Sequence, residues 1–177
     1  MVKQEQIEEW KSQYHDIYMI GSDPHYGYVR FPDKKAMKMA YSSLKQDSGA
    51  LVNSILANCW LGGDEAVKTD PFFKVVSEQI LDVVSLEDAE VTPIDSTKSK
   101  VTILEFSAVL RIPDRALILE AERKNPSNKP FVSSEYILDK IWVEGDEIMK
   151  ERPLLFFSLL ATIDQLSAVK KEKVKKL

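Results

Sequence analysis

Two pairs of adjacent carboxylates combine a reactive residue type with a recurring position in this chain. Asp64-Glu65 and Asp146-Glu147 each follow a glycine, and neighbouring carboxylates can bind a hard cation or act as general acid and base. Adjacent residues at the start of a helix point to different sides, and the positive end of the helix dipole is enough to favour an acid there. We therefore expect the pairs to cap helices. A metal-dependent enzyme that uses them is the weakest of the alternatives.

The histidines and the cysteine are the other side chains that could bind a metal or react. His15 and His25 lie near Asp16 and Asp23, but there is no H-x-x-x-H spacing on a helix and no third ligand is indicated. Cys59 is the only cysteine, so the chain cannot form an intramolecular disulfide. It lies on the apolar stripe of a predicted helix, where a core position explains it. We predict no metal site.

Other classes of function are disfavoured by what the sequence contains. It shows no phosphate-binding glycine loop, nucleophile elbow or Ser/His/Asp order, so we expect a protein that is not an enzyme and uses no cofactor. The net charge of −4 argues against a nucleic-acid partner. The longest strongly apolar run, 153–163, is far shorter than a bilayer span, and the N-terminus does not resemble a signal peptide. We therefore expect a soluble protein of the host-cell cytoplasm, without a membrane partner.

The acidic pairs belong to a stretch that occurs twice. The stretch 60–71, W-L-G-G-D-E-A-V-K-T-D-P, returns as W-V-E-G-D-E-I-M-K-E-R-P at 142–153, with Trp, Gly, Asp, Glu, Lys and Pro at the same offsets. Further matches are Arg30, Pro32 and Asp33 with Arg111, Pro113 and Asp114. We interpret the chain as two tandem copies of one module. A module of this size would have a marginal core of its own, so we expect the copies to pack as one pseudo-twofold body.

The predicted boundaries follow from composition. Module 1 covers 1–86 and module 2 covers 101–169, and residues 87–100, rich in Asp, Glu, Ser and Thr, form a linker between them. Residues 170–177 form a basic tail, with five lysines against one glutamate. Such a tail is typical of a solvated helix end, since lysines suit the negative end of the helix dipole. A contact with a phosphate or an acidic partner is the alternative.

Hydrophobic periodicity predicts an α+β fold that is mainly helical, with a short β-strand or hairpin followed by about three helices in each module. In module 1 we expect a leading helix over 4–14, a hairpin over 17–31 and a helix capped by Asp33. A second helix with an apolar stripe, from Leu51 to Trp60, is stopped by Gly62-Gly63. A third begins with Asp70 as the cap and Pro71 as the first helical residue.

In module 2 the apolar alternation from 101 to 112 predicts one long strand. Asp114 then caps a helix over about 115–124, and further helices follow at about 133–143 and 153–169. Arg30 and Arg111 end strands at matching positions, where pairing with an acidic loop such as Asp64-Glu65 is a possible role.

The last helices of the two modules differ. The first is amphipathic, whereas 153–163 is apolar almost all round. A helix without a polar face is buried on every side, either by its own chain or by a partner. It is therefore either the central helix between the two copies or a surface for self-association or client binding.

The first module resembles small proteins encoded in the tail gene clusters of bacteriophages and prophages. Over about 70 residues it shares their Y-x-R-x-P start and N-x-x-x-x-N-C-W-x-G-G-D-E-like middle. The matching residues are Tyr28, Arg30, Pro32, Asn53, Asn58, Cys59, Trp60, Gly62, Gly63, Asp64 and Glu65. The second module keeps Arg111, Pro113, Trp142, Gly145, Asp146 and Glu147 but loses the Asn, the Cys and the first Gly.

More loosely, the chain resembles the phage tail assembly chaperones, which coat the helical tape-measure protein until tail tube subunits displace them. The resemblance implies a non-enzymatic protein that binds a tape-measure-like helical client in a groove. We expect the groove to use the third helices, with Phe72, Phe73, Leu154, Phe156 and Phe157 as anchors. The alternative is a virion or intracellular structural protein that assembles with itself as a homo-oligomer.

Overall fold

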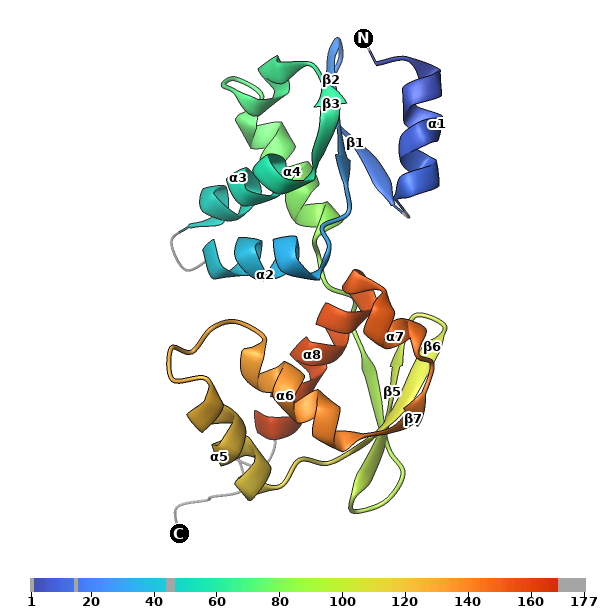
Figure 1. Ribbon diagram of the computed structural model, residues 1–177, viewed down its shortest axis with the longest axis vertical. Coiled ribbons are helices and arrows are strands. Elements are labelled where there is room, and N and C mark those ends of the chain that lie inside the picture. Colours follow the sequence, from blue (N-terminus) through green and yellow to red (C-terminus); the bar gives the residue numbers. More distant parts are fainter. Residues whose placement is uncertain (1, 15, 44–46, 169–177) are drawn as a thin grey trace. The chain divides into compact units, whose positions relative to one another are not determined.

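The computed structural model describes residues 2–14, 16–43 and 47–168 and has a mixed α+β fold with two antiparallel sheets (Figure 1). The chain divides into two compact units, Met1–Ser85 and Leu86–Leu177. The division lies one residue before the predicted end of module 1. His15 and the basic tail 170–177 lie outside the described residues. None of the helices in the described ranges is long and apolar enough to cross a bilayer.

The first unit is built around a three-stranded sheet of order β1-β2-β3. Its elements are α1 (Gln4–Gln13), β1 (Ile17–Ser22), β2 (His25–Arg30), α2 (Lys34–Ser43), α3 (Ser48–Cys59), β3 (Trp60–Gly63), the 3-10 helix η1 (Glu65–Lys68) and α4 (Phe73–Val83). Helix α1 lies on one side of the sheet, and α3 and α4 lie on the other (Figure 1). The core contains Ile20 and Val29 from the sheet with Met37, Ile55 and Ile80 from the helices.

Helix caps and apolar stripes behave as the sequence predicts in the first unit. The Asp33 carboxylate accepts a hydrogen bond from the Ala36 amide at 2.8 Å, as an N-cap does. The stripe of α3 is buried through Leu51, Val52, Ile55, Leu56 and Cys59. Cys59 is 1% exposed, which confirms its predicted core position, and this burial raises the pKa of its thiol to about 11.

Two predicted helix boundaries are wrong. Trp60–Gly63 is not the end of a helix but strand β3, because its backbone pairs with β2, with Gly27 opposite Gly63. The pair Asp70-Pro71 does not start α4. Phe72 occupies the N-cap position there, without a side-chain cap bond. In both places a glycine or proline signal typical of a helix end serves a strand or a turn, which only long-range pairing reveals.

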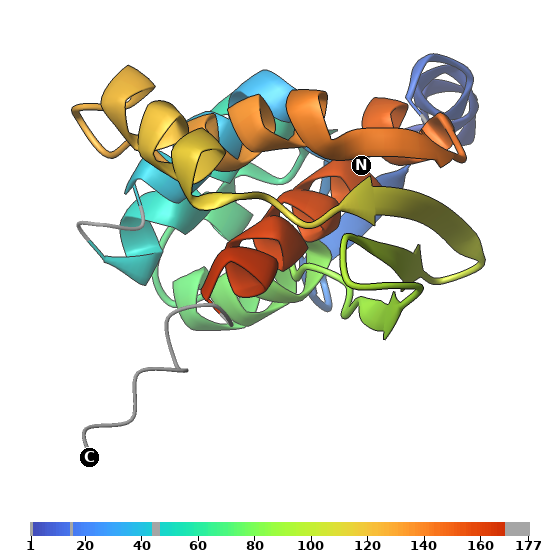
Figure 2. The same cartoon turned by 90° about the horizontal axis from the view of Figure 1, so that it is seen from below.

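The second unit has a four-stranded sheet of order β4-β5-β6-β7. Its elements are β4 (Glu90–Pro93), β5 (Lys98–Ile103), β6 (Phe106–Arg111), α5 (Arg115–Lys124), α6 (Val132–Ile141), β7 (Trp142–Gly145), α7 (Ile148–Glu151) and α8 (Pro153–Ala168). Helix α8 packs against α6, α7 and β5, and Figure 2 shows it running beside α6. The core combines Val101, Ile103 and Leu110 with residues of α6 and α8.

Two predictions for the second unit need correction. The predicted linker 87–100 contains β4 and the start of β5, and it belongs to the sheet. The predicted single strand 101–112 contains the end of β5, a turn in which Leu104 has a φ of 54°, and β6, which pairs with β5 as an antiparallel hairpin. Buried positions are odd before the turn, at Val101 and Ile103, and even after it, so one continuous alternation missed the turn.

The two sheets share one hydrogen-bonding register. In the first unit Gly27 pairs with Gly63 and Val29 with Trp60; in the second Ala108 pairs with Gly145 and Leu110 with Trp142. A register shift falls between these two pairs in both sheets. The sequence spacing of 81 and 82 residues thus connects residues with the same structural position.

The strand register requires glycine at two positions, which can be tested by substitution. Gly63 and Gly145 have φ values of 131° and 148°, and an added Cβ would lie 2.5 Å from the Cα of Gly27 or Ala108. We expect Gly63→Ala and Gly145→Ala each to lower the free energy of unfolding by about 2 kcal/mol or more, measured by urea denaturation. The control Gly49→Ala, near the start of a helix, should change it by less than about 1 kcal/mol. Alanine variants as stable as the parent would show that the strands do not approach this closely.

Candidate functional site

The structure gives the two residues of each acidic pair different partners. Asp64 caps η1, since its Oδ1 accepts from the Ala66 amide at 2.9 Å, as predicted. Asp146 does not cap α7. Its Oδ2 accepts from the Ser107 amide of β6 at 2.8 Å, which ties β7 to the strand beside it. Both aspartates therefore hold a segment of the backbone in place.

The glutamates of the pairs belong to a second arrangement, which we name the Trp–Lys–Glu stack. In the first unit Lys68 Nζ lies 3.9 Å from the centroid of the Trp60 ring and 2.8 Å from Glu65 Oε2. In the second, the members are Trp142, Lys150 and Glu147, at 4.1 Å and 2.7 Å. A cation over an indole is stabilised by the ring quadrupole, so the repeated W-x-x-G-D-E-x-x-K spacing has a structural explanation.

His25 forms a contact that the sequence did not predict. Its Nδ1 lies 2.5 Å from Asp64 Oδ2, and its ring packs on Phe72 with 5.0 Å between ring centroids. The hydrogen bond from His25 holds the pKa of the Asp64 carboxyl below its usual value, helped by the Ala66 amide. Within the described residues no three His, Cys, Asp or Glu side chains come close enough to hold a metal ion.

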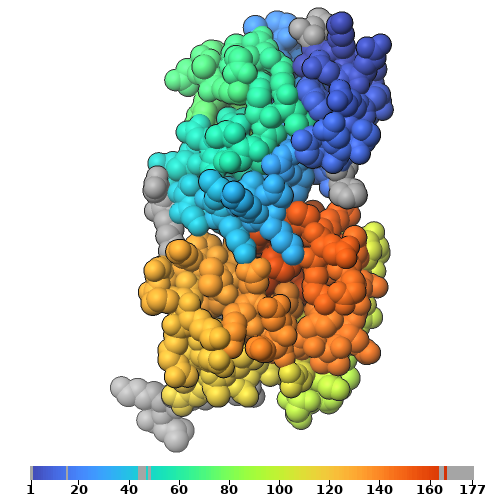
Figure 3. Space-filling view, in the orientation of Figure 1, coloured from blue at the N-terminus to red at the C-terminus, as the bar shows by residue number. Residues whose placement is uncertain are grey.

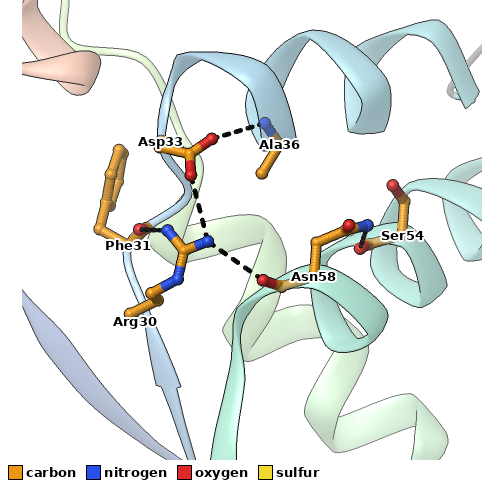
Figure 4. A network of polar contacts seen from close by, with 6 residues as sticks. All are labelled: Arg30, Phe31, Asp33, Ala36, Ser54 and Asn58. Atoms are coloured by element: carbon orange, nitrogen blue, oxygen red, sulfur yellow. Dashed lines mark hydrogen bonds and ion pairs between the residues drawn. The ribbon is translucent and has the colours of Figure 1, made fainter. Parts of the chain in front are cut away.

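The two matching arginines hold helix ends. Arg30 Nη2 donates to the Asn58 carbonyl at the end of α3 and to Asp33 Oδ2, both at 3.2 Å (Figure 4). Arg111 Nη2 donates in the same way to the Lys140 carbonyl of α6. The suggested pairing with Asp64-Glu65 is wrong. The last carbonyls of a helix lack intrahelical donors and carry its negative dipole end, so they attract a guanidinium more strongly than a distant loop does.

A small surface pocket of about 190 Å³ lies beside this network. Its lining residues are Arg30, Asp33, Lys35, Ala36, Met39 and Asn58. The Arg30 guanidinium already donates to Phe31, Asp33 and Asn58, so the pocket does not present an unengaged arginine to an anion. We assign it to the junction of β2, α2 and α3.

The predicted binding residues divide into two groups. Phe156 and Phe157 are 4% and 0% exposed, and the Phe157 ring packs on Phe131 with 4.7 Å between centroids. Burial within the second unit explains the apolar character of α8, and a buried ring touches a partner only if the unit opens. This counts against these two residues as anchors. Phe72, Phe73 and Leu154 are half-buried, and partner binding by them stays a prediction.

A different apolar surface lies on the first sheet. The Trp10 ring of α1 packs on Tyr28 of β2 with 5.8 Å between centroids, and it lies directly over Gly62 of β3. We call Tyr28 and Gly62 the α1-binding face. Met19 lies opposite Tyr28 on β1 and is 58% exposed, the highest value for a large apolar side chain in the described part of the chain. Gly62 was the available signal, because the second copy of the motif has Glu144 in its place.

Comparison with known proteins identified no relative: no family model, no curated protein and no solved structure matches the chain. Three of the residues that carry the resemblance to phage tail-cluster proteins make contacts within the fold of the first unit. Arg30 donates to the end of α3, Trp60 lies under Lys68, and Gly63 leaves room for the close approach of β2. Tyr28 and Gly62, which belong to the same motif, lie instead in the α1-binding face.

The arginine contact can be tested by a charge-preserving change. Arg30→Lys keeps the cation but cannot reach Asp33 and Asn58 with one planar group, so we expect a loss of about 1–2 kcal/mol in the free energy of unfolding by urea. Lys35→Met, at an exposed position of the same pocket, should change it by less than about 0.5 kcal/mol. Equal stability of Arg30→Lys and the parent would contradict the assigned role.

Asp33 makes stability depend on pH. The hydrogen bond from the Ala36 amide, aided by Arg30, lowers the pKa of this carboxyl from its usual 3.8. A pKa lowered by folding adds stability that is present above 3.8 and lost as the pH falls through the lower folded value. Asp33→Asn keeps the capping oxygen but not the charge. We therefore expect the advantage of the parent over this variant to shrink below about pH 4. The NMR titration of Asp33 Cγ measures the same shift directly, and a midpoint at or above 3.8 would contradict it.

Proposed function

We propose that this protein is a non-enzymatic binding factor of phage or prophage tail assembly that holds an apolar helical client, such as a tape-measure protein, in solution. One observation carries the proposal: the first sheet already binds a helix, α1, through aromatic side chains, and leaves Met19 exposed beside it. A flexible thioether on an open face adapts to helices of varied sequence. The resemblance to tail-cluster proteins supports the same class of partner.

The repeated charged residues favour a binding function over a catalytic one, because each already has an interaction partner within its own unit. The aspartates bond to backbone amides, and the glutamates pair with lysines that lie over tryptophans. The arginines donate to helix-end carbonyls. These contacts account for the recurrence of the motif without a reaction.

We also propose that the two units are copies of one duplicated module. The shared strand register, the two Trp–Lys–Glu stacks and the two arginine contacts with helix ends support a common origin. Their packing as a pseudo-twofold body stays a prediction. The units differ before the hairpin, where the first has α1 and the second has β4. We therefore assign helix binding to the first unit.

A self-assembling structural protein is the second candidate. Ile94 and Leu104 of the second unit are 54% and 52% exposed. Exposed apolar side chains near strand ends suit contacts between copies. In that case the homo-oligomer itself would be the functional form.

Co-expression with a client and light scattering separate the two candidates. The client is the long helical product of a neighbouring tail gene, expressed alone or together with this protein. A tail-assembly factor should move most of the client from the insoluble to the soluble fraction, in a complex of defined mass. A large homo-oligomer that leaves the client insoluble would reject this function in favour of the structural candidate.

A further inference from the structure

We propose that the α1-binding face is the client site, and that α1 occupies it as a placeholder which a client helix replaces. The inference rests on the proposed function and identifies the surface that performs it. The occupant is an amphipathic helix with aromatic or large apolar side chains one turn apart, which is the chemistry of Trp10 in α1 and of Tyr14 at its C-cap.

Helix α1 has the properties of a detachable element. It has ten residues, none of them buried, and Lys3 at its N-cap makes no side-chain cap bond. A helix of this length is marginal by itself in water, so its stability comes from the surface beneath it. In the space-filling view it forms an outer edge of the first unit, in dark blue (Figure 3).

The surface beneath α1 is shaped for an aromatic side chain. An added Cβ on Gly62 would lie 3.1 Å from Cη2 of Trp10, so the missing side chain leaves the room that the indole uses. Tyr28 lies opposite Gly62 in the sheet and contacts the same ring. One turn along α1, the Arg30 guanidinium lies over the Tyr14 ring at 5.6 Å. The α1-binding face thus contacts Trp10 of α1, and Arg30, on the same strand as Tyr28, contacts Tyr14 at the C-cap of that helix.

The strand register shared by the two units does not depend on the α1-binding face. In the second unit the same register places Val109 opposite Glu144, where the first has Tyr28 opposite Gly62. No helix precedes the hairpin there; β4 does. The second unit therefore has the same strand register without a counterpart of Tyr28, Gly62 or α1.

Met19 explains why a client could bind better than α1. It lies beside Tyr28 on the same face and remains 58% exposed with α1 in place. A longer apolar helix would cover Met19 as well and bury more apolar surface. The client must outcompete a tethered helix whose effective concentration is on the order of millimolar. Weakening α1 should therefore raise the apparent affinity for a helix added in trans.

The test uses the full chain and a fluorescein-labelled peptide with the sequence of residues 2–14, followed by fluorescence anisotropy. We expect Trp10→Ala to bind the peptide about tenfold or more tightly than the parent, because its own helix no longer competes. Adding Gly62→Glu, the residue of the second unit, should abolish this binding. The matched control, Trp10→Ala with Glu144→Gly, should bind within about twofold of Trp10→Ala alone. Far-UV circular dichroism and urea denaturation establish that each variant is folded.

Three outcomes would overturn the assignment. These are equal peptide binding by Trp10→Ala and the parent, binding that survives Gly62→Glu, and concentration-dependent dimers in which copies exchange α1. The client solubility assay separates this inference from the proposed function. If folded Trp10→Ala/Gly62→Glu still keeps the client soluble, the function stands and the site is wrong. If the peptide results hold but the parent does not solubilise the client, the site stands and the tail-assembly function fails.

Discussion

The close approach of two backbones at the β2–β3 and β6–β7 pairs is the constraint on which both units depend. At Gly63 and Gly145 the facing Cα atom occupies the space of a side chain, and the backbone adopts a φ that favours glycine. The following aspartate amide then donates to the carbonyl of Tyr26 or Ser107. This contact sets where the chain turns after the strand and so where the Trp–Lys–Glu stack forms.

The same constraint gives the charged residues of the repeated motif a structural explanation. Each charged side chain bonds to backbone or to an opposite charge close by in sequence or register. Lys68 and Lys150 cover indole rings, and Arg30 and Arg111 satisfy carbonyls that a helix end leaves open. Charged residues that stabilise a fold recur for the same reason as catalytic ones, because both need a specific geometry. Recurrence alone therefore does not distinguish structure from chemistry.

The surface that we propose for partner binding lies where the two units differ. The frame of strands, helices and stacks is common to both, whereas the aromatic face under α1 exists only in the first. The apolar helix α8, the most prominent candidate surface in the sequence, is buried in its own unit. The surface that we propose for an exchangeable partner is instead the α1-binding face, where Trp10 of α1 lies over Gly62.

The sequence by itself determined the caps of α2 and α5, the hairpin β1–β2 and the buried stripe of α3, because these depend on neighbours within a few residues. Only the tertiary structure decided that Trp60–Gly63 is a strand, that Arg30 meets α3, and that Gly62 accommodates Trp10. Each of these contacts joins residues about 30 or more positions apart. Local periodicity does not report such contacts, and a glycine has the same local signature at a helix end as under an aromatic ring.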